Sequence, residues 1–87
     1  MNTYKKIIKH FGEDAQIDKS IEELRELENE LCLKEPNLDN IIQEIADVLN
    51  MIIQITIIFN LSWWEILKIM IDKNKRTLKR IKEGYYE

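Results

Sequence analysis

The chain has 87 residues, of which 45% are hydrophobic, and a formal net charge of −3. This length corresponds to a single domain, residues 1–87, and the acidic balance argues against electrostatic binding to a nucleic acid polymer. The only cysteine, Cys32, excludes an intrachain disulfide and a cysteine-rich zinc site. A reducing, cytoplasmic setting is therefore expected.

Apolar residues recur every three or four positions in the first part of the chain, which is typical of amphipathic helices. We expect a first helix over Thr3–Phe11, ended by Gly12. A second helix is expected over Ala15–Leu33, because Pro36 and the asparagine-rich segment after it break the pattern.

Two further helices are predicted in the second half of the chain. The third is expected from Asn40, whose side chain would cap it, to Phe59. The fourth is expected over Trp63–Glu83, with Ser62 as its N-terminal cap and Gly84 as its stop. The sequence thus predicts an all-α fold, a bundle of about four helices. Its apolar content exceeds what one thin bundle buries, so we expect dimerisation or tetramerisation to complete it.

The most apolar stretch, residues 48–64, resembles a membrane span at first sight. It is interrupted by polar residues and is shorter than the ~20 apolar residues that cross a bilayer. Among those polar residues are Asn50, Gln54, Thr56 and Asn60. We therefore expect a buried helix and no membrane contact.

Two carboxylate pairs at helical spacing are the main functional signal. Glu23 and Glu26 lie in "EELRE", and Glu44 and Asp47 lie in "EIADVLN". The second pair belongs to a narrow polar arc on a helix that is otherwise apolar, so this helix should be surrounded by protein. Adjacent carboxylates repel each other there unless a cation compensates them. Oxygen ligands favour a hard cation, Mg²⁺ or its substitute Mn²⁺. The alternative is a set of buried salt bridges to basic residues of the last helix.

The charge distribution along the chain is uneven. Every charged residue from Glu35 to Glu65 is acidic, whereas residues 68–82 carry seven Lys or Arg and one acid. Lys73, Arg76 and Arg80 share one helix face, which could bind phosphates. The alternative is a solvated basic face that complements the helix dipole. Asn50 and Gln54 continue the polar arc past Asp47. They could bind a base or a sugar, or simply satisfy each other.

The order of these motifs resembles the ExxE…ExxD signature of the MazG-like all-α nucleoside triphosphate pyrophosphohydrolases, and most closely their short, single-domain phage and Gram-positive members. The downstream "DKNKRTLKRI" resembles the Lys-x-x-Arg segment of that superfamily, here Lys73 and Arg76. The resemblance covers roughly residues 16–81. Longer members carry additional segments that build the base pocket, and no base-reading motif is recognisable here.

The resemblance implies a helical bundle completed by a second subunit, with Mg²⁺ held by Glu23, Glu26, Glu44 and Asp47. It also implies an enzyme that hydrolyses a (deoxy)nucleoside triphosphate to the monophosphate and pyrophosphate. Glu26 or Glu23 would act catalytically by orienting or deprotonating the attacking water. The alternative is a non-catalytic helical oligomer that serves as a nucleotide-binding or protein-interaction module.

Overall fold

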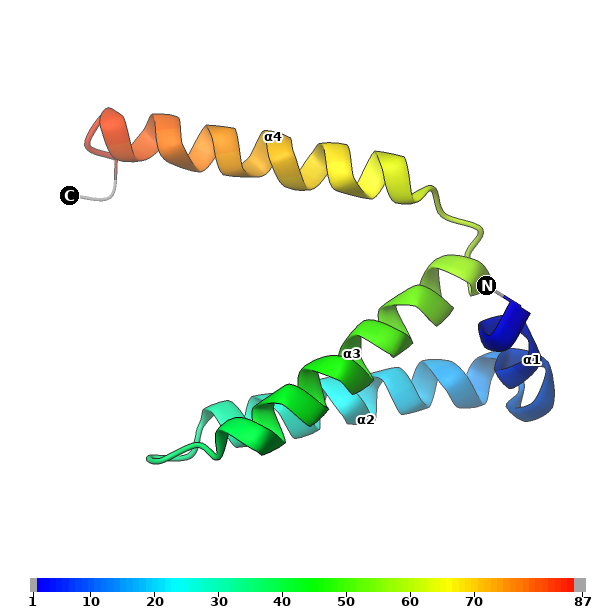
Figure 1. The fold of residues 1–87 in the computed structure, drawn as a ribbon. Helices are drawn as coiled ribbons and strands as arrows, with labels where there is room; N and C mark the ends of the chain where they lie inside the picture. The colour runs from blue at the N-terminus through cyan, green and yellow to red at the C-terminus, as the bar shows by residue number, and fades with distance from the viewer. Residues whose placement is uncertain (1, 86–87) are drawn as a thin grey trace.

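A computed structural model describes residues 2–85, which form four helices and no strand (Figure 1). The all-α fold expected from the sequence is confirmed. The elements are α1 (Asn2–Phe11), α2 (Glu13–Leu31), α3 (Leu38–Ile58) and α4 (Trp63–Lys82).

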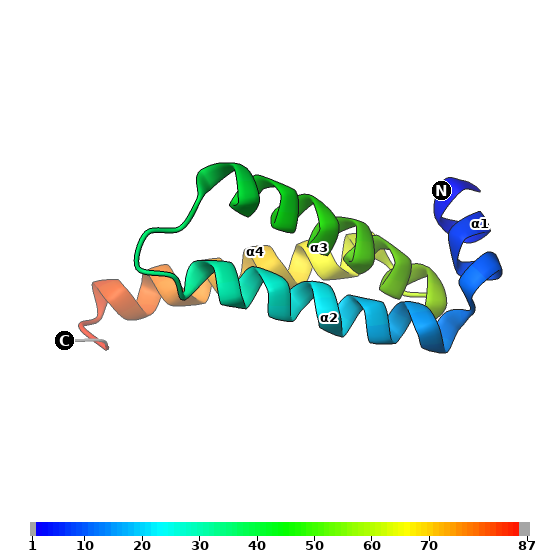
Figure 2. The same ribbon diagram turned by 90° about the horizontal axis from the view of Figure 1, so that it is seen from below.

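Helices α2 and α3 form an antiparallel hairpin, which makes most of the contacts between elements (Figures 1 and 2). The loop between them is held by the side chain of Glu30, whose Oε1 accepts a hydrogen bond from the backbone N–H of Asn37 at 2.9 Å. Helix α1 packs across one end of this hairpin and contacts both helices, burying Ile8. The interior of this three-helix unit contains more polar side chains than large apolar ones, since the buried apolar set is only Ile8, Val48 and Met51.

The helix boundaries differ from the sequence prediction in two places. Helix α2 occupies Glu13–Leu31 rather than 15–33, because Gly12, with φ of 93°, lets it begin directly after α1. The prediction that Asn40 caps α3 was wrong. The cap is Asn37, whose side-chain Oδ1 accepts a hydrogen bond from the N–H of Asn40 at 3.1 Å. Both residues are good capping types, and Asn37, with φ of −81° and ψ of 121°, has the extended backbone that a cap requires.

The predicted boundaries of α4 were closer. Ser62 caps it by accepting a hydrogen bond from the N–H of Glu65 at 3.3 Å. After its last turn, Gly84 adopts φ of 75°, and the next N–H, that of Tyr85, donates to the carbonyl of Arg80 at 2.8 Å. This is the left-handed glycine termination that the sequence predicted.

Helix α4 diverges from the rest of the chain instead of closing a four-helix bundle (Figure 1). None of its residues is buried, and no other helix makes more than marginal contact with it. The radius of gyration is 16.5 Å, whereas a compact domain of this length would have about 12 Å. The turn that directs α4 away contains Asn60, with φ of 52°.

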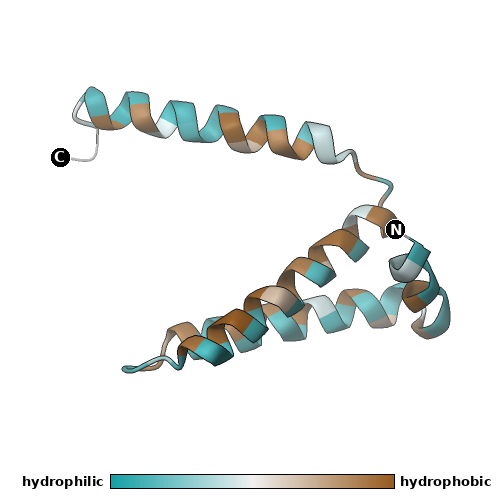
Figure 3. Ribbon diagram, in the orientation of Figure 1, coloured by the Kyte–Doolittle hydropathy of each residue, from teal (hydrophilic) through white to brown (hydrophobic). Residues whose placement is uncertain are grey.

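The expectation that the third helix is surrounded by protein was wrong for a single chain. Apolar residues follow the outer face of α3 and recur along α4 (Figure 3). Leu49, at the middle of the outer face of α3, is 55% exposed. The surface that the sequence predicted to be buried is therefore left open because α4 does not cover it.

Helix α3 is also long and apolar enough, by length and composition alone, to cross a membrane. Core helices of soluble proteins pass the same test when they are mostly buried, whereas 22% of this stretch is buried in the single chain. On one side of α3, Glu44, Asp47 and Gln54 face α2 or the space beside it, a polar arrangement that fits a helix packed in protein. The absence of membrane contact stays a prediction.

Candidate metal centre

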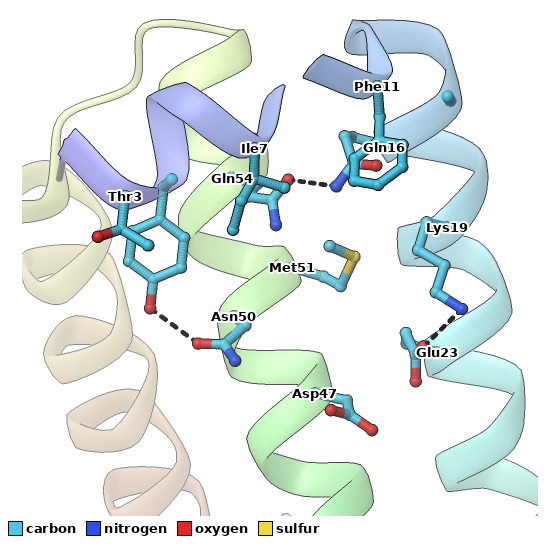
Figure 4. A pocket seen from close by; sticks show the side chains of 12 residues that line it. Thr3, Ile7, Phe11, Gln16, Lys19, Glu23, Asp47, Asn50, Met51 and Gln54 are labelled. Carbon is cyan, nitrogen blue, oxygen red and sulfur yellow. Dashed lines mark hydrogen bonds and ion pairs between the residues drawn. The ribbon is translucent and has the colours of Figure 1, made fainter. Parts of the chain in front are cut away.

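Three carboxylates from two helices meet on the inner side of the α2–α3 hairpin. Glu23 comes from α2, and Glu44 and Asp47 come from α3. One oxygen of each lies within 4.8 Å of the others. Glu44 and Asp47 share a face because they are three residues apart, and the antiparallel packing places Glu23 opposite them (Figure 4). The convergence predicted from sequence is therefore confirmed for three of the four acids.

Two of these carboxylates are incompletely satisfied. Glu23 is only 7% exposed, and the Oε2 atoms of Glu23 and Glu44 are both buried without a hydrogen-bond partner. A buried carboxylate oxygen that lacks a partner is costly, because its hydration is lost and nothing replaces it. A hard cation placed between these oxygens would remove that cost, so the donor set fits Mg²⁺ or Mn²⁺. Asp47 is exposed, which leaves one side of the cluster open.

The fourth acid, Glu26, lies at the edge of the cluster and does not belong to the group of three. Its pKa is raised, first because its protonated carboxyl can share a hydrogen bond with Glu23, and next because of the negative charge of Glu23. Burial and the charge of Glu44 act in the same direction. Glu26 is thus close enough to interact electrostatically with Glu23 of α2 and with Glu44 of α3.

A lysine that sequence reasoning missed lies beside the cluster. The Nζ of Lys19 is 3.1 Å from Oε1 of Glu23 and 3.6 Å from Oε1 of Glu22. The pKa of Lys19 is raised, mainly by its hydrogen bond to Glu23 and then by the charge of Glu22. The spacing of four residues between Lys19 and Glu23 was the signal that could have revealed this pair.

The basic residues predicted to bind phosphate lie elsewhere. Lys73, Arg76 and Arg80 are all on α4, which does not pack against α2. Among the described residues, none of the three forms an ion pair with an acid of the cluster, and the Arg80 guanidinium lies 5.0 Å from the ring centre of Tyr85. Within one chain, the structure therefore does not bring these cations to the carboxylates. It also does not show the salt bridges to the last helix that were the alternative.

A cavity of about 570 Å³ adjoins the acids, between α1, α2 and α3 (Figure 4). Glu23 and Asp47 form part of its wall, and Asn50 lies further along it. The side-chain Oδ1 of Asn50 accepts a hydrogen bond from the hydroxyl of Tyr4 at 2.7 Å. Asn50, predicted to bind a base or a sugar, thus borders a real cavity next to the carboxylates.

The cavity wall also contains residues that the sequence did not predict to meet in one site. Helix α1 supplies Tyr4, Ile7 and Phe11, and a buried pair, Gln16 and Gln54, lies at the end away from the acids (Figure 4). The periodicity of the first helix and the polar arc of the third mark most of these positions one helix at a time. Their meeting in one wall could not be predicted, because the cavity exists only where three separate helices meet.

The chain matches no protein-family model, no curated protein and no solved structure. The resemblance to MazG-like pyrophosphohydrolases, which depends on the order and spacing of the acidic motifs, therefore stays a prediction.

Proposed function

We propose that the chain is a Mg²⁺-dependent nucleoside triphosphate pyrophosphohydrolase, which converts a (deoxy)nucleoside triphosphate and water to the monophosphate and pyrophosphate. The observation that supports this most is the meeting of Glu23, Glu44 and Asp47 with two buried carboxylate oxygens unpaired. Such a set of oxygens is suited to a divalent cation, and polyphosphates are the substrates that divalent cations commonly hold.

Glu23, Glu44 and Asp47 would hold the cation, and Glu26 would complete the set from its edge. When bound, Mg²⁺ or Mn²⁺ neutralises the triphosphate and lowers the pKa of water. Asp47 is the exposed member, so the triphosphate approaches from its side.

The chain's own groups would handle the proton. Water attacks the α-phosphorus, the bond from that phosphorus to the bridging oxygen breaks, and pyrophosphate leaves. Glu26 accepts the proton of the water. Lys19, beside Glu23, offers a cation to the phosphates.

The proposal includes self-association. An apolar stripe with coiled-coil spacing follows the outer face of α3, and another follows α4, and all of their large residues are exposed. The stripes consist of Leu38, Ile42, Ile45, Leu49 and Ile52 on α3, and of Trp64, Leu67, Ile71, Leu78 and Ile81 on α4. A second copy of the chain would cover them in a dimer or tetramer. In such an assembly, Lys73, Arg76 and Arg80 would meet the phosphates bound to another copy.

Pyrophosphate release tests the activity directly. The eight common NTPs and dNTPs are compared with Mg²⁺, with Mn²⁺ and with a chelator. Asp47→Asn should abolish turnover while the helical circular dichroism is retained. The matched control is Asp39→Asn, the same substitution on the exposed first turn of α3, which should keep the wild-type rate.

Two results would contradict the proposal. If Asp47→Asn kept the wild-type turnover rate, the carboxylates would have no role in the mechanism. Metal-dependent binding of a nucleotide without any monophosphate product would instead favour the non-catalytic nucleotide-binding module.

A further inference from the structure

We propose that the cavity between α1, α2 and α3 is a nucleoside subsite, in which the amide pair Gln16–Gln54 reads the edge of the base and Asn50 with Tyr4 contacts the sugar. This inference rests on the proposed function, because the triphosphate of the same nucleotide would lie at the acids. It assigns the binding of the base to α1 and to the pairing of Gln54, a residue of the predicted polar arc, with Gln16, which the sequence did not single out.

The cavity has three levels along the helix axes. On α3, Asp47, Asn50 and Gln54 follow one another one turn apart, at about 4.5 Å and about 10.5 Å along the axis from Asp47. On α2, running the other way, Glu23 lies opposite Asp47 and Gln16 lies opposite Gln54 (Figure 4). The three levels match the order of the parts of a nucleotide, with the phosphates at the acids, the sugar at Asn50 and the base at the glutamine pair.

The far level is polar but incompletely satisfied. Nε2 of Gln16 donates a hydrogen bond to Oε1 of Gln54 at 2.6 Å, and the two residues are only 6% and 3% exposed. The other amide atoms, Oε1 of Gln16 and Nε2 of Gln54, have no hydrogen-bond partner among the described residues and are not among the fully buried polar atoms, so they remain accessible. One acceptor group and one donor group are thus open to a ligand, and the same holds if both amides are turned over. A nucleobase edge presents such groups side by side.

The other walls fit a planar, partly apolar ligand. Ile7 and Phe11 of α1 and Met51 of α3 line the cavity around the amide pair. Bases bind on such surfaces through their flat faces, while a few fixed polar groups select the edge. At the middle level, the Tyr4 hydroxyl is 2.7 Å from Asn50, which ties α1 to α3 and leaves the Asn50 amide nitrogen available to a sugar hydroxyl.

The test compares ligands with and without a nucleoside. Calorimetry in Mg²⁺ measures binding of NTP and dNTP analogues with nitrogen in place of the oxygen between the α- and β-phosphorus, and of inorganic tripolyphosphate. At least one analogue should bind about tenfold or more tightly than tripolyphosphate, as expected when buried polar groups pair with a ligand. Gln54→Leu should reduce its affinity to that of tripolyphosphate and leave tripolyphosphate binding unchanged.

Three further variants make the result decisive. Gln43→Leu, the same substitution at an exposed position of α3 outside the cavity, should keep the base preference. Because Gln54→Leu leaves the Gln16 amide without its partner, the double variant Gln16→Leu/Gln54→Leu removes both polar groups and preserves the fold better. It should lose the preference in the same way. Tyr4→Phe should weaken the preferred analogue only.

The failures are distinguishable. If tripolyphosphate binds with Mg²⁺ but no analogue binds more tightly, the subsite is refuted and the proposed function stands. The subsite is also refuted if both glutamine variants, folded by circular dichroism, keep the wild-type preference. If neither tripolyphosphate nor any analogue binds, the proposed function and the subsite fall together.

Discussion

The exposed stripe on α3 yields a quantitative prediction for self-association. Leu49 lies at its middle and is 55% exposed in the single chain. Full burial of a leucine contributes about 1.5–3 kcal/mol, so covering the exposed half contributes about 0.8–1.5 kcal/mol. A two-fold dimer contains the residue twice. Leu49→Asn should therefore cost about 1.5–3 kcal/mol of association free energy, which raises the dissociation constant about 10- to 150-fold.

Sedimentation equilibrium over a dilution series measures that constant. Gln43→Asn is the matched control, because it introduces the same residue, with a similarly low helix propensity, at an exposed position of α3 away from the stripe. It should dissociate at the wild-type concentration. The reasoning is refuted if the wild-type chain is monomeric at all concentrations, or if Leu49→Asn dissociates at the same concentration as the control.

Three further predictions concern single interactions. Lys19→Met should increase the affinity for Mn²⁺ measured by calorimetry, because Lys19 no longer competes with the cation for Oε1 of Glu23. An unchanged affinity would mean that the ammonium group of Lys19 does not weaken metal binding. Folding raises the pKa of Glu26 above 4.5, so its ionisation opposes folding above that pH. Without metal, Glu26→Gln should thus melt at a higher temperature than the wild type at pH 7, and this difference in melting temperature should vanish below pH 4.5. A difference that stays the same at every pH would contradict the raised pKa of Glu26. Ser62→Ala removes the cap of α4 and should destabilise that helix by ~1 kcal/mol, seen as a loss of helical circular dichroism. An unchanged helical signal would show that the bond at 3.3 Å is not formed in solution.

The aspects of the fold that depend on neighbouring residues could be predicted from the sequence. The repeats at three and four residues give the helices, and Gly12, Ser62 and Gly84 mark ends that the structure confirms. The Asn37 cap was missed because several polar residues after Pro36 are all suitable caps. Only the hydrogen bond to the N–H of Asn40 distinguishes them.

The acidic cluster was predictable in part. Glu44 and Asp47 share a face by spacing alone, and their apolar surroundings indicated an inward position. Glu23 and Glu26 look equivalent in sequence, yet Glu23 is buried in the cluster and Glu26 lies at its edge. The difference in burial depends on how α2 is rotated about its axis relative to α3. The sequence of α2 alone does not determine that rotation.

The sequence by itself determined the four helices and the charge that each face carries, because backbone hydrogen bonding and side-chain spacing act over a few residues. Only the tertiary structure decided that α1 closes a cavity above the acids, that Lys19 reaches Glu23, and that α4 holds Lys73 and Arg76 apart from them. Each of these depends on contacts between residues far apart in the chain, and on the direction in which the turn at Asn60 sends the last helix. Such contacts are set by how whole helix surfaces fit together, which no local pattern of residues encodes.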